Sequence, residues 1–173
     1  KIDRGNPATP GTPTTTTPTN STNQNWSWTA AADTISDIQN YLYRITGSVT
    51  QALTSTGSNV TSFTTTLREG IYNFFVTAKD NAGNTGPESS GGSLTIDITA
   101  PATPSATPAA GDYTSDQSVS LFSSDAGSGL ASIYYTTDGS TPDNTKTLYS
   151  GAITVDKDMT IKAIAYDDAG NVS

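Results

Sequence analysis

Carboxylates are the side chains of this sequence whose type and spacing could do chemistry, because they recur at the ends of apolar segments and in Gly-rich turns. Asp97 ends an apolar segment, Asp125 opens a Gly/Ser-rich loop, and Asp167 and Asp168 open the turn Asp-Asp-Ala-Gly-Asn. Ca²⁺ takes roughly six to eight oxygen ligands, often from Asp, Asn and backbone carbonyls. These four carboxylates therefore form a candidate calcium site.

A tandem of β-sandwiches would bring the four residues together. The last strand of a sandwich ends at the bottom of its module, whereas the loop before the third strand and the turn before the last strand lie at the top. Asp97 would then face Asp125, Asp167 and Asp168 of the next module, and their charges would repel unless a cation joined them. The alternative is that the turn carboxylates only accept hydrogen bonds from nearby amides.

A similar set of carboxylates, Asp33, Asp37 and Asp80, lies in the first half of the chain. We expect this set to be less favourable for a cation, because a long Thr/Pro tract separates Asp3 from it.

Other kinds of chemistry find little support in the composition. The chain has 173 residues, no Cys and no His, so a disulfide and the commonest general base are both absent. Paired carboxylates in predicted turns have no aromatic cleft or basic partner nearby, and we expect no catalysis. A net charge of −8, from 16 acids and 8 bases, argues against nucleic-acid binding. No apolar run is long enough to insert into a membrane.

Two kinds of surface feature leave alternatives open. Trp26 and Trp28 are two residues apart, so both fall on one face of a strand. They could pack in a core, as strand Trp residues in sandwiches usually do, or form a platform for sugar rings. Tyr134 or Tyr135 with Asp138 is a weaker candidate for such a surface. The sequons at the following positions are candidate glycosylation sites: Asn20, Asn25, Asn59 and Asn171.

An internal repeat organises the chain. The pattern Ile-Asp-x-x-x-Pro-Ala-Thr-Pro occurs at residues 2–10 and 96–104, and the turns Asp-Asn-Ala-Gly-Asn and Asp-Asp-Ala-Gly-Asn occur at 80–84 and 167–171. The elements come in the same order in both halves, so the chain contains two modules of one plan.

The fold class predicted is all-β, with two tandem immunoglobulin-like sandwiches joined by Pro-rich linkers. Short alternating segments bounded by turn residues predict the strands. They lie at 25–29, 40–45, 59–66, 70–78 and 93–98 in the first half, and at 118–123, 131–137, 147–155 and 159–166 in the second. The predicted domains are a linker at 1–24, a sandwich at 25–100, a linker at 101–111 and a sandwich at 112–173.

The second sandwich is expected to lack its last strand. The first has the segment Ser-Leu-Thr-Ile-Asp after its Asp-Asn-Ala-Gly-Asn turn, whereas the second has only Asn171–Ser173 after the equivalent turn. Residues 1–3 in turn resemble the tail of such a strand. A neighbouring copy or a continuation of the chain would pair with the open edge.

Residues 104–173 resemble the C-terminal domain of chitobiases and β-hexosaminidases. The resemblance rests on Gly-Asp-Tyr at 111–113, Ile-Tyr-Tyr-Thr-Thr-Asp-Gly-Ser-Thr-Pro at 133–142, Leu-Tyr-Ser-Gly at 148–151, Thr-Ile-Lys-Ala-Ile-Ala at 160–165 and Asp-Ala-Gly-Asn at 168–171. It implies a small immunoglobulin-like sandwich that is separate from the catalytic barrel.

Residues 25–97 are similar to immunoglobulin-like repeats of bacterial adhesins and surface proteins. The matching segments are Trp-Ser-Trp, Tyr-Leu-Tyr-Arg-Ile, the segment at 70–84 and Ile-Asp-Ile-Thr-Ala-Pro. The resemblance implies calcium binding between modules at Asp97, and less securely at Asp3.

The function expected is that of a non-enzymatic structural module of an extracellular, prokaryotic surface protein, filament or adhesin stalk. Its partners would be neighbouring copies or repeats of the same protein, with glycans as a further candidate. The alternative is a carbohydrate-binding accessory region of a secreted glycoside hydrolase. Exposed, coplanar aromatic rings would favour the alternative, whereas buried Trp26 and Trp28 beside a bound cation would favour the structural role.

Overall fold

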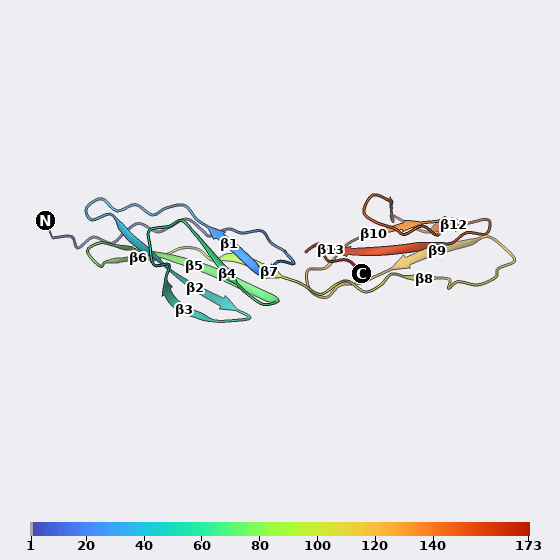
Figure 1. Cartoon of the computed structure of the whole chain (residues 1–173), viewed down its shortest axis with the longest axis horizontal. Helices are drawn as coiled ribbons and strands as arrows, with labels where there is room; N and C mark the ends of the chain where they lie inside the picture. Colours follow the sequence, from blue (N-terminus) through green and yellow to red (C-terminus); the bar gives the residue numbers. More distant parts are fainter. Residues whose placement is uncertain (1) are drawn as a thin grey trace. The chain divides into compact units, whose positions relative to one another are not determined.

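The computed structural model describes residues 2–173, and they form two compact units built from β-strands (Figure 1). The first unit ends at Ile96, and the second comprises Asp97–Ser173. None of the residues from 2 to 173 belongs to a helix that could cross a membrane. The predicted all-β class with immunoglobulin-like sandwiches is confirmed.

Two antiparallel sheets make up the first unit. One pairs β1 with β4, and the other has the order β3-β2-β5-β6, with β7 pairing with the first half of β5. The strands are β1 (Asn23–Ser27), β2 (Ile38–Gly47), β3 (Gln51–Ser55), β4 (Ser62–Thr66), β5 (Gly70–Asp80), β6 (Thr85–Glu88) and β7 (Gly92–Ile96). Apolar residues alternate with polar residues along β5 and β7, so the apolar side chains of both strands point into the core. Their packing there attaches this sheet to the opposite one.

Aromatic rings fill the core of the first unit. Trp26 is fully buried and stacks on Phe74, with ring centroids 4.6 Å apart. Trp28 meets Tyr41 edge-on at 5.5 Å and is almost as well buried. Both Trp side chains therefore pack between the sheets, and the alternative of a sugar platform at these residues is wrong.

The Pro/Thr-rich segment at the start of the chain packs along the first unit, whereas the sequence predicts a linker at residues 1–24 that precedes the sandwich. Thr14 and Ser27 exchange backbone hydrogen bonds, and the Thr19 amide donates to the Thr95 carbonyl of β7. Pro7 and Pro13 are fully buried. Pro lacks an amide donor, so this segment pairs only at selected residues and shows no apolar alternation in the sequence.

The second unit is also a sandwich of two sheets. Their orders are β11-β10-β13 and β12-β9-β8. The strands are β8 (Ser105–Thr107), β9 (Gln117–Phe122), β10 (Leu130–Thr136), β11 (Thr147–Leu148), β12 (Ile153–Val155) and β13 (Lys162–Asp167). The core between the sheets consists of Val119, Leu121, Ile133, Ile153 and Ala165, with partly buried residues such as Tyr135 and Tyr149 around it.

Two details of the second unit differ from the sequence-based expectation. The predicted linker at 101–111 contains β8, which pairs with β9, because a short strand of Ser, Ala and Thr gives no apolar signal. The predicted strand at 147–155 is two strands in different sheets, since β11 pairs with β10 and β12 pairs with β9. The intervening residues carry the chain across the sandwich.

The packing of the Pro/Thr-rich segment can be tested at Gly92. A Cβ atom there would overlap the Pro13 carbonyl and touch the Trp26 ring. We expect Gly92→Ala to destabilise the first unit by about 1–3 kcal/mol through overpacking. Thermal unfolding followed by Trp fluorescence measures this unit alone, because both Trp residues lie in it.

Gly151→Ala is the control for this substitution, because nothing lies within 4 Å of the added methyl group. It should leave the Trp-detected transition unchanged. A Gly92→Ala variant as stable as the wild type would show that residues 13–19 do not pack on β7.

Candidate metal centre

Three carboxylates converge at one end of the second unit. Asp97, Asp125 and Asp167 each offer an oxygen atom, and these atoms lie within 4.8 Å of one another. Asp97 is the first residue of the unit, Asp125 lies in the loop between β9 and β10, and Asp167 is the last residue of β13. Asp97 and Asp167 are buried, being 1% and 3% exposed, so two of the three charges are held away from bulk water.

Hydrogen bonds fix each of these carboxylates. The Asn171 amide donates to Oδ1 of Asp167 at 2.7 Å, and its side-chain Nδ2 donates to Oδ2 at 2.7 Å. The same Nδ2 atom donates to the Asp97 carbonyl at 2.8 Å. Asp125 accepts the amides of Gly127 and Gly129 through one oxygen, both at 2.9 Å. The second Asp125 oxygen therefore remains available to a ligand.

Gly127 is needed at its position because it lies directly against the Asp97 carboxylate. A Cβ atom at residue 127 would overlap that carboxylate. Asp97 in turn accepts the Ser128 amide at 2.6 Å and the Thr99 amide at 3.1 Å. The Gly/Ser-rich loop thus wraps the first carboxylate of the group and leaves no room for a side chain.

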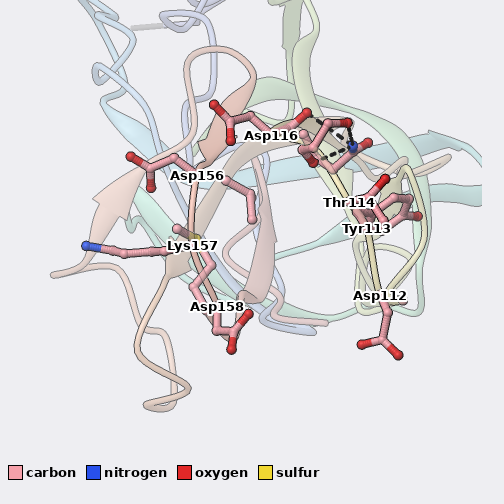
Figure 2. A pocket seen from close by; sticks show the side chains of 12 residues that line it. Asp112, Tyr113, Thr114, Asp116, Asp156, Lys157 and Asp158 are labelled. Atoms are coloured by element: carbon pink, nitrogen blue, oxygen red, sulfur yellow. Dashed lines mark hydrogen bonds between the residues drawn. The ribbon is translucent and has the colours of Figure 1, made fainter.

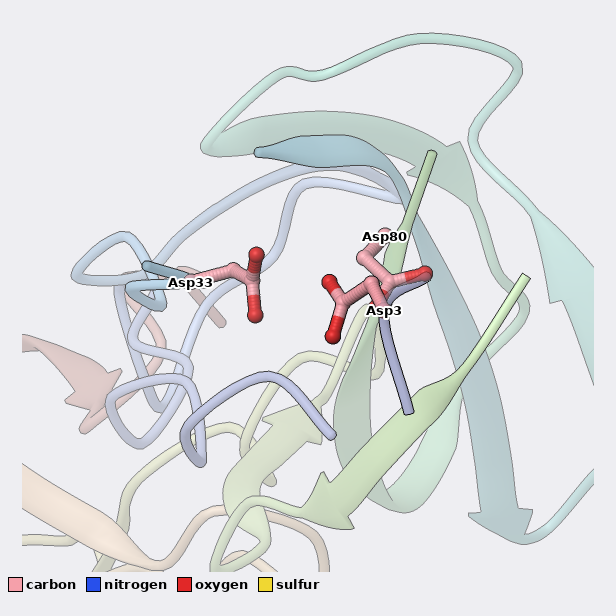
Figure 3. A group of neighbouring side chains, drawn as sticks. All are labelled: Asp3, Asp33 and Asp80. Atoms are coloured by element: carbon pink, nitrogen blue, oxygen red, sulfur yellow. The ribbon is translucent and has the colours of Figure 1, made fainter. Parts of the chain in front are cut away.

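The first unit contains an equivalent group, formed by Asp3, Asp33 and Asp80 (Figure 3). Asn84 holds Asp80 through its amide and its Nδ2 atom, both at 2.8 Å, as Asn171 holds Asp167. Figure 3 shows the Asp33 carboxylate pointing toward those of Asp3 and Asp80. Oδ2 of Asp3 is buried and has no hydrogen-bond partner among the residues described. A buried oxygen of this kind fits a cation, which would satisfy it.

The electrostatics of both groups favour the charged carboxylate. Burial is the largest single influence on the pKa of Asp97 and raises it, but hydrogen bonds from Ser128 and Thr99 together hold this pKa below its ordinary value. The pKa of Asp80 is also lowered, because bonds from Asn84, Ala82 and Ser36 outweigh burial. Across residues 2–173, no ion pair joins a Lys or Arg to any of the six carboxylates.

The structure includes some predicted residues in these groups and leaves others out. Asp168 does not join Asp97, Asp125 and Asp167, because it follows the end of β13 in the turn and its side chain is exposed. Asp37 likewise does not join Asp33 and Asp80. Asp3 does join them, contrary to expectation, because the Pro/Thr tract folds back along the unit and does not separate Asp3 from it.

Asn171 is a member of the site that sequence reasoning assigned to glycosylation. Both of its Nδ2 hydrogens are used, one on Asp167 and one on Asp97. A glycan would replace one of them, so the folded site and glycosylation at Asn171 are in conflict. The repetition of Asp-x-Ala-Gly-Asn in both halves was the signal that could have assigned Asn171 to the site. The sequons at Asn20, Asn25 and Asn59 are exposed.

A polar cleft lies elsewhere on the second unit (Figure 2). It has a volume of about 510 Å³ and is formed by residues 111–117 facing residues 155–159. Tyr113 is half exposed, and its hydroxyl donates to the Ala109 carbonyl at 2.7 Å. Figure 2 shows Asp112 on the side of Tyr113, and Asp156 and Asp158 on the opposite side.

The Tyr residues predicted as a weaker glycan surface do not form a flat platform. Tyr135 packs against the core, whereas Tyr134 meets Tyr166 edge-on, with rings at 90° and centroids 5.7 Å apart. Asp138 accepts hydrogen bonds from the amide and hydroxyl of Ser140, as expected of a turn residue.

Comparisons with known proteins agree with this architecture. The arrangement of strands is that of immunoglobulin-like β-sandwich modules. Residues 108–173, all within the second unit, match the family "Chitobiase/beta-hexosaminidase C-terminal domain". No curated protein matches the sequence of the chain.

Two solved structures are similar to this chain over most of its length. Fibronectin(III)-like modules of Clostridium thermocellum CbhA are 16% identical, with a TM-score of 0.48, and the match covers 93% of this chain and 88% of that one. The FN1–FN3 domains of chicken CNTN1 are also 16% identical, with a TM-score of 0.45 and coverages of 98% and 65%.

The lowered pKa of Asp97 predicts a pH dependence of stability in a metal-free buffer. A carboxyl whose pKa is lower in the folded state than its ordinary 3.8 stabilises the fold above that pH, and this contribution is lost as the pH falls through the lowered pKa. We therefore expect the second unit to lose stability as the solution is acidified below about pH 4. Asp97→Asn should be less stable at neutral pH and show a shallower acid loss.

Thermal unfolding from about pH 7 to about pH 2, followed by amide NMR of the second unit, measures this effect. Asp168→Asn is the matched control and should keep the slope of the wild type. Identical acid profiles for Asp97→Asn and the wild type would contradict the assignment.

Proposed function

We propose that this chain is a non-catalytic accessory region of a secreted glycoside hydrolase. The observation that carries the proposal is the match of residues 108–173 to the C-terminal domain of chitobiases and β-hexosaminidases. The candidate site is consistent with it, because carboxylates held by amides in tight turns offer no acid–base pair beside a substrate cleft. The second proposal is that the chain is a segment of a surface filament or adhesin stalk. The burial of Trp26 and Trp28 is compatible with both proposals.

Within this role, each carboxylate group acts as a cation staple, and Ca²⁺ is the ion that its chemistry fits best. The ligand atoms that Asp97, Asp125 and Asp167 offer are all carboxylate oxygens, the hard ligands that Ca²⁺ prefers. His and Cys, the ligands that favour zinc, do not occur in the sequence.

A bound cation would join residues that are far apart in sequence. In the second unit it would link the first residue, the loop between β9 and β10, and the end of β13. The core of that unit consists of five buried apolar side chains, and the unit has no disulfide. Packing of so small a core contributes little to the free energy of unfolding, so a bound cation would add stability that the unit needs. The extracellular environment proposed for the protein would supply calcium, and neighbouring modules of the same polypeptide are its proposed partners.

Calcium binding can be measured by calorimetry and thermal unfolding of the chain. We expect two ions per chain, with dissociation constants of roughly 10⁻⁴–10⁻³ M, as in extracellular modules. Calcium at about 100 times the dissociation constant should stabilise each unit by about 2.7 kcal/mol. Asp167→Asn should remove the effect on the second unit, and Asp80→Asn the effect on the first.

Asp168→Asn is the control for calcium binding, because Asp168 is adjacent to the site in sequence but outside the carboxylate group. It should bind two ions like the wild type. The absence of both heat and stabilisation at millimolar calcium would refute the staple, although it would leave the accessory role itself standing.

A contact with glycan is the finer function that we propose for the second unit, and the cleft beside Tyr113 is its site. Tyr113 is the exposed aromatic side chain of the cleft, and carboxylates and Gln117 next to it can accept or donate hydrogen bonds to sugar hydroxyls. An apolar ring face with polar neighbours is the usual composition of a small-ligand site.

Chitin oligosaccharides are the test ligands, given the family that residues 108–173 match. We expect Tyr113→Ala to weaken binding by about fivefold or more, from the loss of about 1 kcal/mol of ring contact. Tyr113→Phe keeps the ring and should retain most of the affinity. NMR titration measures both constants. Binding that survives Tyr113→Ala unchanged would exclude this cleft.

A further inference from the structure

One side of the second sandwich is open along β13. A groove of about 340 Å³ lies there, between the chain around Pro108 and the edge of β13. Its walls include Val119, Leu121, Ile161 and Ala163, which belong to the core of the unit or pack against it. The groove thus leads directly to the hydrophobic core, and none of residues 2–173 covers this apolar surface, which is an unusual arrangement.

Backbone groups along this edge also lack partners. Thr160 bonds Thr137 and Gly139 on the side of β10, and Ala165 bonds Ser173 on the opposite side. Because strand residues alternate, Ile161 and Ala163 direct their amides and carbonyls to the side of Ala165. Among residues 2–173, no strand pairs with them on that side. The groove is therefore bordered by free hydrogen-bonding groups.

The first unit shows what fills the equivalent place. Strands β5 and β13 both lead into an Asp-x-Ala-Gly-Asn turn, and β7 runs antiparallel to β5 on the edge that is free in β13. On its other side, β7 is bonded by Thr19. Leu94 and Ile96 of β7 are each 1% exposed and point into the core, whereas Ser93 between Gly92 and Leu94 points outward.

We propose that the groove of the second unit is an acceptor for one extended strand of the β7 type. The incoming segment would run antiparallel to β13, bond the backbone of Ile161 and Ala163, and place two aliphatic side chains, two residues apart, over Val119 and Leu121. Strand addition of this kind gains affinity from backbone hydrogen bonds and specificity from alternate side chains. A compact apolar ligand would leave the backbone groups of the edge unpaired, which disfavours it.

This acceptor role goes beyond the accessory function proposed above and does not depend on calcium or glycan. The probe is a synthetic peptide with the sequence of residues 91–97, Gly-Gly-Ser-Leu-Thr-Ile-Asp, added to the whole chain. We expect it to slow amide hydrogen exchange at Ile161 and Ala163 by about tenfold at ten times its dissociation constant. A peptide with Asp in place of its Leu and Ile should give no protection.

Ala163→Pro supplies a matched variant of the acceptor. It removes the amide that faces the groove and leaves the bonds between β10 and β13 in place, so the unit should fold and the peptide should no longer protect Ile161. Exchange at residues 70–74 of β5 is the internal control, because this segment is already paired on both sides, with the chain of β2 and with β7, and should not respond.

Three results would overturn the proposal. The first is no protection at millimolar peptide, and the second is equal protection by the Asp-substituted peptide. The third is protection of Ile161 and Ala163 that grows with protein concentration without peptide, since it would show that a second copy of the chain covers the edge.

Discussion

The pairing of an Asp carboxylate with the Asn four residues later is the interaction on which both sites depend. In each unit the Asn uses its backbone amide and its side-chain amide to hold both oxygens of one Asp. This closes the turn at the end of the long strand and fixes the carboxylate where the other two Asp residues can meet it. A short, local contact thus determines the geometry of a group whose members are far apart in sequence.

That locality explains how much of the architecture the sequence predicted. Strands with apolar alternation, such as β5 and β13, were found because their pattern states which face is buried. The pairing of residues 14–19 and the strand β8 were missed, since Thr, Pro, Ala and Ser pair through their backbone without any side-chain periodicity. The sequence predicts one strand at 147–155, because the crossing between the two sheets has no signature in the sequence beyond a Gly.

The candidate site shows the same contrast between residues that local sequence patterns predict and residues whose position depends on packing. Asp97, Asp125 and Asp167 were identified from their order relative to the turns, which is a sequence property. Asp168 lies outside the group because it follows the end of β13 and is exposed, which its adjacency to Asp167 in the sequence does not reveal. Asp3 was undervalued because its place depends on how the Pro/Thr tract folds back, and that depends on packing against β7 that no local pattern records.

The position of Asp97 has a practical consequence for how the second module is delimited. The matched family range begins at residue 108, and the conventional boundary would fall in the Pro-rich segment before it. A fragment started there would keep every strand from β9 to β13 but lose the carboxylate that Asp125 and Asp167 face. The segment that matches the family and the unit that completes the acidic site therefore have different beginnings, and the second starts at the residue that directly follows β7.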